Sequence, residues 1–268
     1  MPELPEVETV KRGIEKLVGS RLHHVLIRHF NLRYPIEPDL AHKLIGKQIL
    51  GITRRAKYLI LKLEQAYLII HLGMSGRLTL VQADDEIKKH DHVDLVFDYA
   101  ILRYNDPRRF GCMVYTESLH DHPLFKHLGP EPLDEQFNAE YLLAKLKARK
   151  STIKQLIMDN HLVVGVGNIY ACEALFLAHI SPARIGLSIT PQEATDLVAA
   201  IKQVLALAIK LGGSSLRDYK QADGKLGNFQ TIHNVYGKAG KKCNQCNSII
   251  LETRLGQRNS FYCPQCQK

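Results

Sequence analysis

The feature that most restricts the fold of this 268-residue chain is a set of four cysteines near its end. Cys243 and Cys246 form one Cys-x-x-Cys pair, Cys263 and Cys266 form a second, and 16 residues separate the two pairs. Each pair offers two thiolates from one turn, and the gap is long enough for a β-hairpin that brings the turns together. The spacing therefore predicts one structural Zn2+ per chain, in a module too small to fold without its metal.

The remainder of the chain is long enough for a sizeable core, and it is basic. Its 36 lysines and arginines against 27 acidic residues give a net charge of +9 and a pI near 9.2. This balance favours an anionic partner such as nucleic acid, although a merely basic soluble protein is the alternative. No stretch approaches the ~20 apolar residues of a membrane span, and no apolar run follows a basic start. Together with the cysteine spacing, these observations predict a cytoplasmic protein without membrane contact.

The first half of the chain has the pattern of a helix followed by strands. Residues 3–18 predict an amphipathic helix, because apolar residues recur at helical spacing: Val7, Val10, Ile14, Leu17 and Val18. Short apolar runs then alternate with turns rich in Gly, Asp, Asn and Pro, which is typical of a β-sandwich or barrel. The expected strands are Leu22–Ile27, Ile49–Thr53, Tyr58–Leu63, Tyr67–Leu72, Val93–Phe97, Ile101–Tyr104 and Cys112–Tyr115.

A linker-like segment at 129–132 precedes a helical region. The last of its helical patterns begins with Thr190 as N-cap and Glu193 as capping-box partner, and a Gly-Gly pair ends it. Residues 214–232 are polar and predict a mobile loop. Three domains are expected, at 1–130, 131–233 and 234–268. The helical patterns cover residues 139–149, 152–158, 168–178 and 191–211.

The start of the chain offers a candidate nucleophile. Met1 precedes Pro2, a junction that N-terminal processing cuts because the second residue is small. Cleavage would free a secondary amine able to attack a sugar carbon and form an iminium. An α-amino group titrates near pH ~8, so a useful fraction is uncharged at neutral pH. Glu3 stands close enough to move protons. The alternative is an ordinary helix start, where Pro and Glu are both favoured.

Several loops carry side chains suited to DNA, and an ordinary surface turn is the alternative for each. Glycines within 160–168 precede a helix, so backbone N–H groups there can face a phosphate. Residues 106–111 place two guanidiniums beside an aromatic ring, and Met74 stands among glycines as an apolar wedge would. Residues 88–92 suggest a metal site or, better, a solvated charged loop. Arg258, in the expected hairpin turn at 256–259, can reach a phosphate.

Together these residues resemble one family, the formamidopyrimidine-DNA glycosylases, which are bacterial base-excision repair enzymes. The matching segments occur in family order over nearly the whole chain. The start of the chain resembles the oxidised-purine branch of the family, because position 4 is Leu, where the sister endonuclease VIII-type enzymes usually have Gly. The segments are Pro2–Thr9, Arg55–Leu59, His71–Arg77, Lys89–Val93, Asp106–Gly111, His127–Leu133, Met158–Glu173 and the cysteine-bearing tail with Gln257-Arg258.

The resemblance implies an α+β multidomain fold: an N-terminal helix-flanked β-sandwich, a helix–two-turn–helix domain and a C-terminal β-hairpin zinc finger. It implies a bifunctional glycosylase and abasic-site lyase that removes oxidised purines through a Schiff base at Pro2 and then eliminates both flanking phosphates. Glu3 would open the sugar ring, and Lys57 and Arg258 would hold those phosphates. An endonuclease VIII-type enzyme for oxidised pyrimidines and a non-catalytic DNA-binding zinc protein are the alternatives.

The resemblance also implies a partner, damaged double-stranded DNA, bound by a monomeric enzyme at the bacterial nucleoid. A phosphate would be gripped by Asn168 and its turn, and further DNA contacts would come from His90, Arg108 and Arg149. Met74, Arg108 and Phe110 would fill the gap left by the flipped base. A loop near 214–228 would cover the everted lesion, and no base-reading residue is assigned there.

Overall fold

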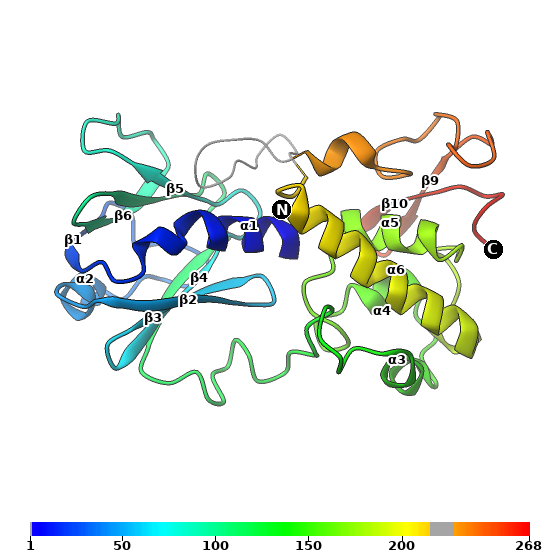
Figure 1. The fold of residues 1–268 in the computed structure, drawn as a ribbon, viewed down its shortest axis with the longest axis horizontal. Coiled ribbons are helices and arrows are strands. Elements are labelled where there is room, and N and C mark those ends of the chain that lie inside the picture. Colours follow the sequence, from blue (N-terminus) through cyan, green and yellow to red (C-terminus); the bar gives the residue numbers. More distant parts are fainter. Residues whose placement is uncertain (1, 215–227) are drawn as a thin grey trace. The chain divides into compact units, whose positions relative to one another are not determined.

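The structure, a computed structural model, describes residues 2–214 and 228–268 (Figure 1). The chain divides into two compact units: unit 1 comprises residues 1–126 and 211–230, and unit 2 comprises residues 127–210 and 231–268. Most of the predicted mobile loop lies outside the described residues, and its described end forms a short 3-10 helix, Phe229–Ile232. Within the described ranges, no helix is long and apolar enough to cross a membrane. The three-domain division stays a prediction.

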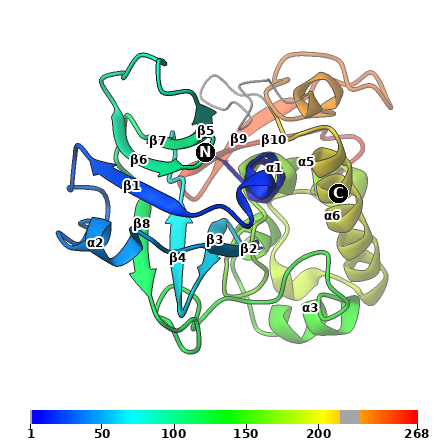
Figure 2. The ribbon, with the colours of Figure 1, turned by 60° about the vertical axis from the view of Figure 1, so that its left-hand side comes forward.

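Unit 1 is a β-sandwich of two antiparallel four-stranded sheets, as the spacing of its apolar runs predicts (Figure 2). The first sheet has the order β1-β6-β7-β5, and the second has the order β2-β3-β4-β8. The strands are β1 (Leu22–Ile27), β2 (Ile49–Arg55), β3 (Tyr58–Leu63), β4 (Ala66–His71), β5 (Arg77–Val81), β6 (Asp91–Phe97), β7 (Ile101–Asn105) and β8 (Cys112–Thr116).

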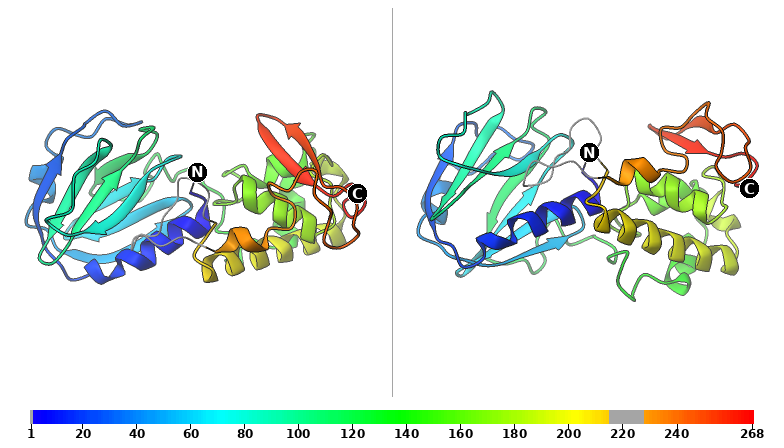
Figure 3. Two further views of the ribbon diagram at one scale, coloured as in Figure 1. Left: turned by 90° about the horizontal axis from the view of Figure 1, so that it is seen from above. Right: turned by 45° about the horizontal axis from the view of Figure 1, so that its top comes forward.

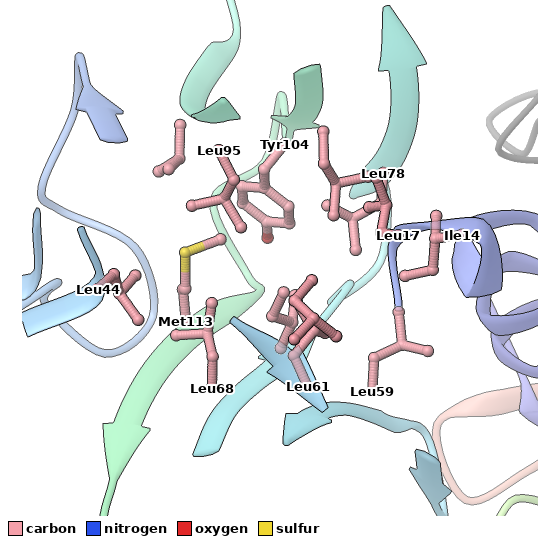
Figure 4. Close-up of a cluster of buried hydrophobic side chains, with 14 of the residues drawn as sticks. Ile14, Leu17, Leu44, Leu59, Leu61, Leu68, Leu78, Leu95, Tyr104 and Met113 are labelled. Carbon is pink, nitrogen blue, oxygen red and sulfur yellow. The ribbon is translucent and has the colours of Figure 1, made fainter. Parts of the chain in front are cut away.

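The core of unit 1 lies between the two sheets and under the first helix (Figure 4). That helix, α1 (Leu4–Ile14), continues into a 3-10 turn, Glu15–Leu17, and the apolar side chains of both are buried as the helical spacing predicts. The prediction is wrong for Val18, which is 45% exposed because the backbone becomes extended there. Leu61 and Leu68 from one sheet meet Leu95 and Tyr104 from the other, and all four are fully buried. Burial of this extent contributes roughly 1.5–3 kcal/mol per large side chain, so the sandwich is a firm support for its loops.

Two elements of unit 1 were not predicted. Strand β5 is an edge strand with one fully buried residue, Leu78, so its apolar signal is weak. Helix α2 (Leu40–Leu44) has five residues, which is too short for a helical period to appear in the sequence.

Unit 2 combines helices with a terminal hairpin (Figure 3). All four predicted helices are present, and the capping box at the start of the last one is formed, since Glu193 accepts from the Thr190 N–H at 2.9 Å and donates its own N–H to the Thr190 hydroxyl at 3.3 Å. The elements are α3 (Ala139–Leu146), α4 (Ile153–Ile157), α5 (Asn168–Leu177), a 3-10 helix at Gly186–Ser188, α6 (Pro191–Lys210), β9 (Leu251–Leu255) and β10 (Arg258–Tyr262).

The hairpin corrects one detail of the sequence analysis. Strands β9 and β10 are joined by a two-residue turn, Gly256-Gln257, and Arg258 pairs with Leu255 at the start of β10. Arg258 therefore belongs to the strand and not to the turn, because Gly256 at φ +60° closes the turn one residue earlier than the sequence analysis expects.

Candidate catalytic terminus and nucleic-acid contacts

The first residues of the chain are buried at the start of α1. Glu3 is the N-cap of this helix and is only 3% exposed. Its carboxylate accepts from the backbone N–H of Glu6, while the Glu6 carboxylate accepts from the Glu3 N–H at 2.8 Å. Helix N-termini favour negative charge, so this capping box holds an anionic carboxylate next to Pro2 along the chain. A fixed acid/base group beside the Pro2 nitrogen is what proton transfer at that atom requires.

Glu6 has a second role that the sequence does not reveal. Its other carboxylate oxygen accepts from the backbone N–H of Ser214 at 2.7 Å, and the carboxylate is 2% exposed. Gly213, at φ +80°, lies so close that an added Cβ would be 2.9 Å from the Glu6 carboxylate. Glu6 thus joins the start of the chain to a segment more than two hundred residues away.

Lys57 lies in the tight turn between β2 and β3, next to Ala56 at φ +53°, and it is 9% exposed. Burial and then the Lys57 charge lower the pKa of His71 to about 4. His71 is therefore neutral at physiological pH, and its Nδ1 accepts from the Gly73 N–H at 2.9 Å. The Lys57 ammonium therefore acts electrostatically on an imidazole that is neutral at physiological pH.

Met74, Arg108 and Phe110 come from two loops at one end of the sandwich. Met74 follows β4, and the other two lie between β7 and β8. The Arg108 guanidinium carbon is 4.8 Å from the centroid of the Phe110 ring, and Phe110 is 45% exposed. An exposed phenyl ring with a guanidinium stacked on it is suited to contact with bases.

The segment at residues 88–92 is neither a metal site nor a fully solvated loop. Asp91 and His92 are buried, and among the described residues only the four cysteines form a group that could hold a metal ion. His90 is half-buried and lines a pocket of about 360 Å³ together with Arg28, Lys89 and other residues of unit 1. The charge of this pocket suits an anion, and the expectation of a metal there finds no support.

In unit 2, Asn168 is brought close to the hairpin that carries Arg258. Asn168 is the first residue of α5, and Gly167 is its N-cap. The Asn168 amide donates to the carbonyl of Asn259 at 3.0 Å, and its oxygen accepts from the ammonium of Lys154 at 2.6 Å. Sequence reasoning did not anticipate this contact between a helix start and a strand ninety residues later.

Lys154 is an anchor that sequence reasoning missed. Its side chain is 1% exposed, and its ammonium donates to the Asn168 side chain, to the Asn259 carbonyl at 3.0 Å and to the Ser260 hydroxyl at 2.7 Å. A buried ammonium is tolerated only when its donors are satisfied. Lys154 therefore fixes helix α4, the start of α5 and strand β10 to one another.

The remaining two candidate contacts are exposed arginines. Arg258 begins β10, and Arg149 lies between α3 and α4, where its backbone bonds to Leu146 and Leu187. Over the ranges that the structure describes, neither guanidinium takes part in a hydrogen bond or ion pair with the protein. Both are available to a phosphate, and no contact of unit 2 brings Arg149 to Asn168 or Arg258 in these ranges.

The four cysteines gather as the spacing predicts. Their sulfur atoms all lie within 4.8 Å of one another, with Sγ–Sγ distances of 3.9 Å for Cys243 and Cys266 and 3.4 Å for Cys246 and Cys263. Tetrahedral zinc with Zn–S bonds of about 2.3 Å separates its sulfur ligands by roughly 3.8 Å. The donor set fits one structural Zn2+, and all four cysteines are free of disulfides.

The zinc module packs directly on α5. Cys243, Cys263 and Ile250 share an apolar cluster with Cys172 and Phe176 of that helix.

A buried carboxylate supports the segment that leads into the module. The Glu173 side chain, 1% exposed, accepts from the backbone N–H groups of three consecutive residues and from one side-chain amide, at 2.7–3.0 Å: Asn234, Val235 and Tyr236.

A β-sandwich with a buried carboxylate at the chain start, a helical unit and a four-cysteine module that fits zinc define a class of modular proteins with a structural metal centre. The chain belongs to the formamidopyrimidine-DNA glycosylase family. The family's N-terminal domain matches residues 1–113, its H2TH domain matches residues 128–220, and the zinc finger found in FPG and IleRS matches residues 240–268.

Relatives and solved structures agree over the full length. The Formamidopyrimidine-DNA glycosylase of Hydrogenovibrio crunogenus is 51% identical, over 100% of this chain and 97% of its own. A mutant Lactococcus lactis FPG in complex with Fapy-dG-containing DNA has a TM-score of 0.93 at 38% identity, and the alignment covers both chains fully. Wild-type Lactococcus lactis Fpg in complex with DNA containing an oxidised pyrimidine has a TM-score of 0.92 at 38% identity, again over both full chains.

Proposed function

We propose that this chain excises oxidised purines, such as 8-oxoguanine and formamidopyrimidines, from double-stranded DNA by using the nitrogen of Pro2 as the nucleophile. Family membership makes the chain a DNA glycosylase and abasic-site lyase of base-excision repair that acts on oxidised bases. The substrate branch and the residues that carry the reaction are the proposal. The observation that carries it is the buried start of α1, where Glu3 is held beside Pro2.

The reaction begins once Met1 has been removed. The Pro2 nitrogen forms a bond to the C1′ atom of the damaged nucleotide, and the C1′–N bond to the base breaks, so the base leaves with the bonding electrons and takes up a proton. The anionic Glu3 carboxylate takes the proton that the Pro2 nitrogen releases and passes it to the ring oxygen O4′ as the C1′–O4′ bond opens, which leaves an iminium between Pro2 and C1′. The iminium acidifies the C2′ hydrogen, and its loss expels the 3′-phosphate. A second elimination expels the 5′-phosphate, and water then releases the sugar fragment.

Cations hold the two phosphates that leave. Lys57 in unit 1 and Arg258 in unit 2 are assigned this role, and Asn168, His90, Arg108 and Arg149 are assigned to other DNA contacts. Support comes from the exposed guanidiniums of Arg149 and Arg258, which make no hydrogen bond within residues 2–214 and 228–268, and from the place of Lys57 in the turn between β2 and β3. Stabilising charge at the leaving phosphates lowers the barrier of both eliminations.

Removal of the base from the stack costs a few kcal/mol, about the energy of unstacking and unpairing one nucleotide. Met74 and Phe110 offset the lost stacking, and Arg108 fills the groove beside them. The cation–π contact between Arg108 and Phe110 supports a joint role.

Borohydride trapping tests the nucleophile. Borohydride reduces the iminium and leaves the protein covalently bound to DNA containing 8-oxoguanine. We expect Pro2→Gly to lower the yield of this adduct sharply, and retention of Met1, verified by intact mass, to abolish it because the nitrogen is then an amide. Pro5→Ala is the matched control, since Pro5 is also buried in the first turn of α1. Equal trapping by the processed wild type, Pro2→Gly and the Met1-retaining protein would assign the nucleophile to another residue. No trapped adduct with the processed wild type would refute the proposal and favour a non-catalytic DNA-binding protein.

A second candidate is the excision of oxidised pyrimidines. It is favoured by the Lactococcus lactis Fpg structure, whose DNA contains an oxidised pyrimidine. Single-turnover cleavage of matched 8-oxoguanine and thymine glycol duplexes decides between the two, and faster cleavage of thymine glycol would reverse the assignment. The enzyme is expected to act as a monomer in the bacterial cytoplasm, at the nucleoid, and sedimentation of the free and DNA-bound protein tests the oligomeric state.

A further inference from the structure

We propose that Asp106 is a positioning residue that joins the loop of Met74 to the loop of Arg108 and Phe110, so that these three side chains enter DNA as one preassembled wedge. The proposal rests on the proposed function, because only a DNA glycosylase that everts its target needs such a wedge.

Asp106 is fully buried, and each of its carboxylate oxygens accepts two hydrogen bonds. Oδ1 accepts from the Ser75 hydroxyl at 2.9 Å and from the Arg108 N–H at 3.3 Å. Oδ2 accepts from the Gly111 N–H at 2.9 Å and from the Tyr104 hydroxyl at 3.2 Å. Hydrogen bonds to an ionised acceptor are about twice as strong as neutral ones, so this carboxylate holds four groups firmly. Two of its donors flank Phe110 and a third directly follows Met74.

Ser75 connects the two loops through two hydrogen bonds of its hydroxyl. Its hydroxyl donates to Asp106 and also accepts from the Arg108 N–H at 3.2 Å, and the side chain is 5% exposed. The two backbones also touch. A Cβ added to Gly73, which has φ +61°, would lie 2.4 Å from the Gly111 nitrogen. The loops therefore have almost no freedom to move apart at their bases.

The tips of the two loops, in contrast, are open to a ligand. Phe110 is 45% exposed, and the Arg108 guanidinium already lies over its ring at 4.8 Å. Between them, Arg109 adopts φ +56° and donates to the ring of His29 at 2.8 Å, so the chain reverses and both neighbours emerge on one side. A wedge ordered before it meets DNA loses little side-chain and loop entropy on insertion.

Tyr104 provides a way to separate positioning from simple support of the fold. It donates to the same carboxylate, but it lies on β7 and carries none of the wedge. Burial, and then the Asp106 charge, raise the pKa of Tyr104 far above its ordinary range, so its hydroxyl is a constant donor. The hydroxyl also donates to the His71 carbonyl at the end of β4, at 3.4 Å. Its loss leaves in place the bonds from Ser75, Arg108 and Gly111 to Asp106, which join the two loops.

The test compares excision from two substrates in single turnover: 8-oxoguanine in a fully paired duplex, and 8-oxoguanine inside a bubble of mismatched neighbours. Insertion matters most where stable stacking must be replaced. We expect Ser75→Ala and Asp106→Asn to slow excision from the paired duplex by roughly tenfold or more, the effect of about one lost charge-assisted hydrogen bond. In the bubble the same variants should be slowed about twofold or less, because its bases are already unstacked.

Tyr104→Phe is the matched control. It should lower the melting temperature as Ser75→Ala does, while leaving the paired-to-bubble rate ratio at the wild-type value. A variant whose two rates fall equally, or not at all, would overturn the proposal, and Ser75→Ala keeps the test decisive if Asp106→Asn fails to fold. Absence of excision by the wild-type enzyme on both substrates would instead refute the proposed function, so the two failures are distinguishable.

Discussion

The two units hold their candidate DNA-contacting side chains by different means. In unit 1, Met74, Arg108 and Phe110 stand on loops that extend from a sandwich with a large apolar core. In unit 2, Asn168 and Arg258 are positioned by a zinc module, the Lys154 ammonium and the Glu173 carboxylate. An apolar core resists changes of solution chemistry, whereas metal ligation and buried charges respond to chelators and to loss of one partner. The candidate contacts of unit 2 are therefore more sensitive to solution chemistry than those of unit 1.

Metal removal should have the largest effect, and it should act on unit 2 alone. Structural zinc contributes on the order of 10 kcal/mol to the folding of small modules. We therefore expect chelation, or Cys263→Ser, to abolish hydrogen-exchange protection in β9 and β10 and to weaken DNA binding by releasing Arg258, while β3 and β4 keep their protection. Cys112→Ser is the control, because Cys112 is buried in β8 and is no zinc ligand. Unchanged DNA binding after proven zinc loss would contradict this view of unit 2.

A core substitution in the sandwich should have the opposite effect: it should destabilise unit 1 and leave the zinc module of unit 2 intact. Leu61 is fully buried between the sheets, and Leu61→Ala should cost about 2–5 kcal/mol of unfolding free energy in unit 1. Zinc content should stay at one ion per chain, because no residue of the module is touched. Urea unfolding combined with a zinc assay measures both quantities, and a parallel loss of zinc would mean that the units do not fold as separately as their composition suggests.

Lowering the pH should destabilise the two units to different extents, but less strongly than the changes above. His71 in unit 1 has its pKa lowered to about 4, so below its ordinary value near 6.5 the unfolded chain binds a proton that the folded chain refuses. Stability is therefore lost as the pH falls from about 6.5 to 4, by at most about 3 kcal/mol. In unit 2 an Arg184 hydrogen bond lowers the pKa of Glu193 to about 2. Its contribution is present above pH 4.5, is lost only as the pH falls towards 2, and is about 1 kcal/mol because the pair is partly exposed.

Hydrogen-exchange protection of each unit, followed from about pH 7 down to pH 4.5, measures this difference. The His71→Gln variant should lose the acid-dependent part of the decline in unit 1 and leave unit 2 as it was. An equally steep decline in that variant would assign the acid sensitivity to another group.

The smallest effect is expected at the buried ammonium. Lys154→Met keeps the length of the side chain but removes the ammonium that three acceptors share, at a cost of about 1–3 kcal/mol. Asn168 should become more mobile, and affinity for abasic-site DNA should fall with it. Lys150→Met removes an exposed charge nearby and serves as the control. Equal losses in both variants would show that only net charge matters, and that Lys154 does not act through Asn168.

The sequence predicts the elements well wherever a period extends over several residues. The seven predicted strands and the four helices of unit 2 are all present, with ends shifted by at most a few residues. The zinc ligands are predicted equally well, because the spacing of the cysteines along the chain identifies them. The sequence does not predict the edge strand β5 or the single-turn helix α2, because neither is long or apolar enough to show a period.

The supporting carboxylates and the buried lysine were not predictable in the same way. Glu6, Asp106 and Lys154 each form hydrogen bonds with groups that are distant in the sequence or lie in another loop. The residues that flank each of them in the sequence do not indicate which group is bound. One signal was available. Glu173 stands in an otherwise apolar helix, and a charge in that setting has to find donors. Such residues mark places where distant segments meet.

The exposure of the four thiolates has a chemical consequence. Cys243 and Cys263 are buried, whereas Cys246 and Cys266 are half-exposed, so a peroxide reaches the latter pair first. Sulfenic or sulfinic acid formation there removes ligands from the metal. Oxidants of the kind that damage DNA bases would therefore also remove ligands from the metal centre that holds the terminal hairpin.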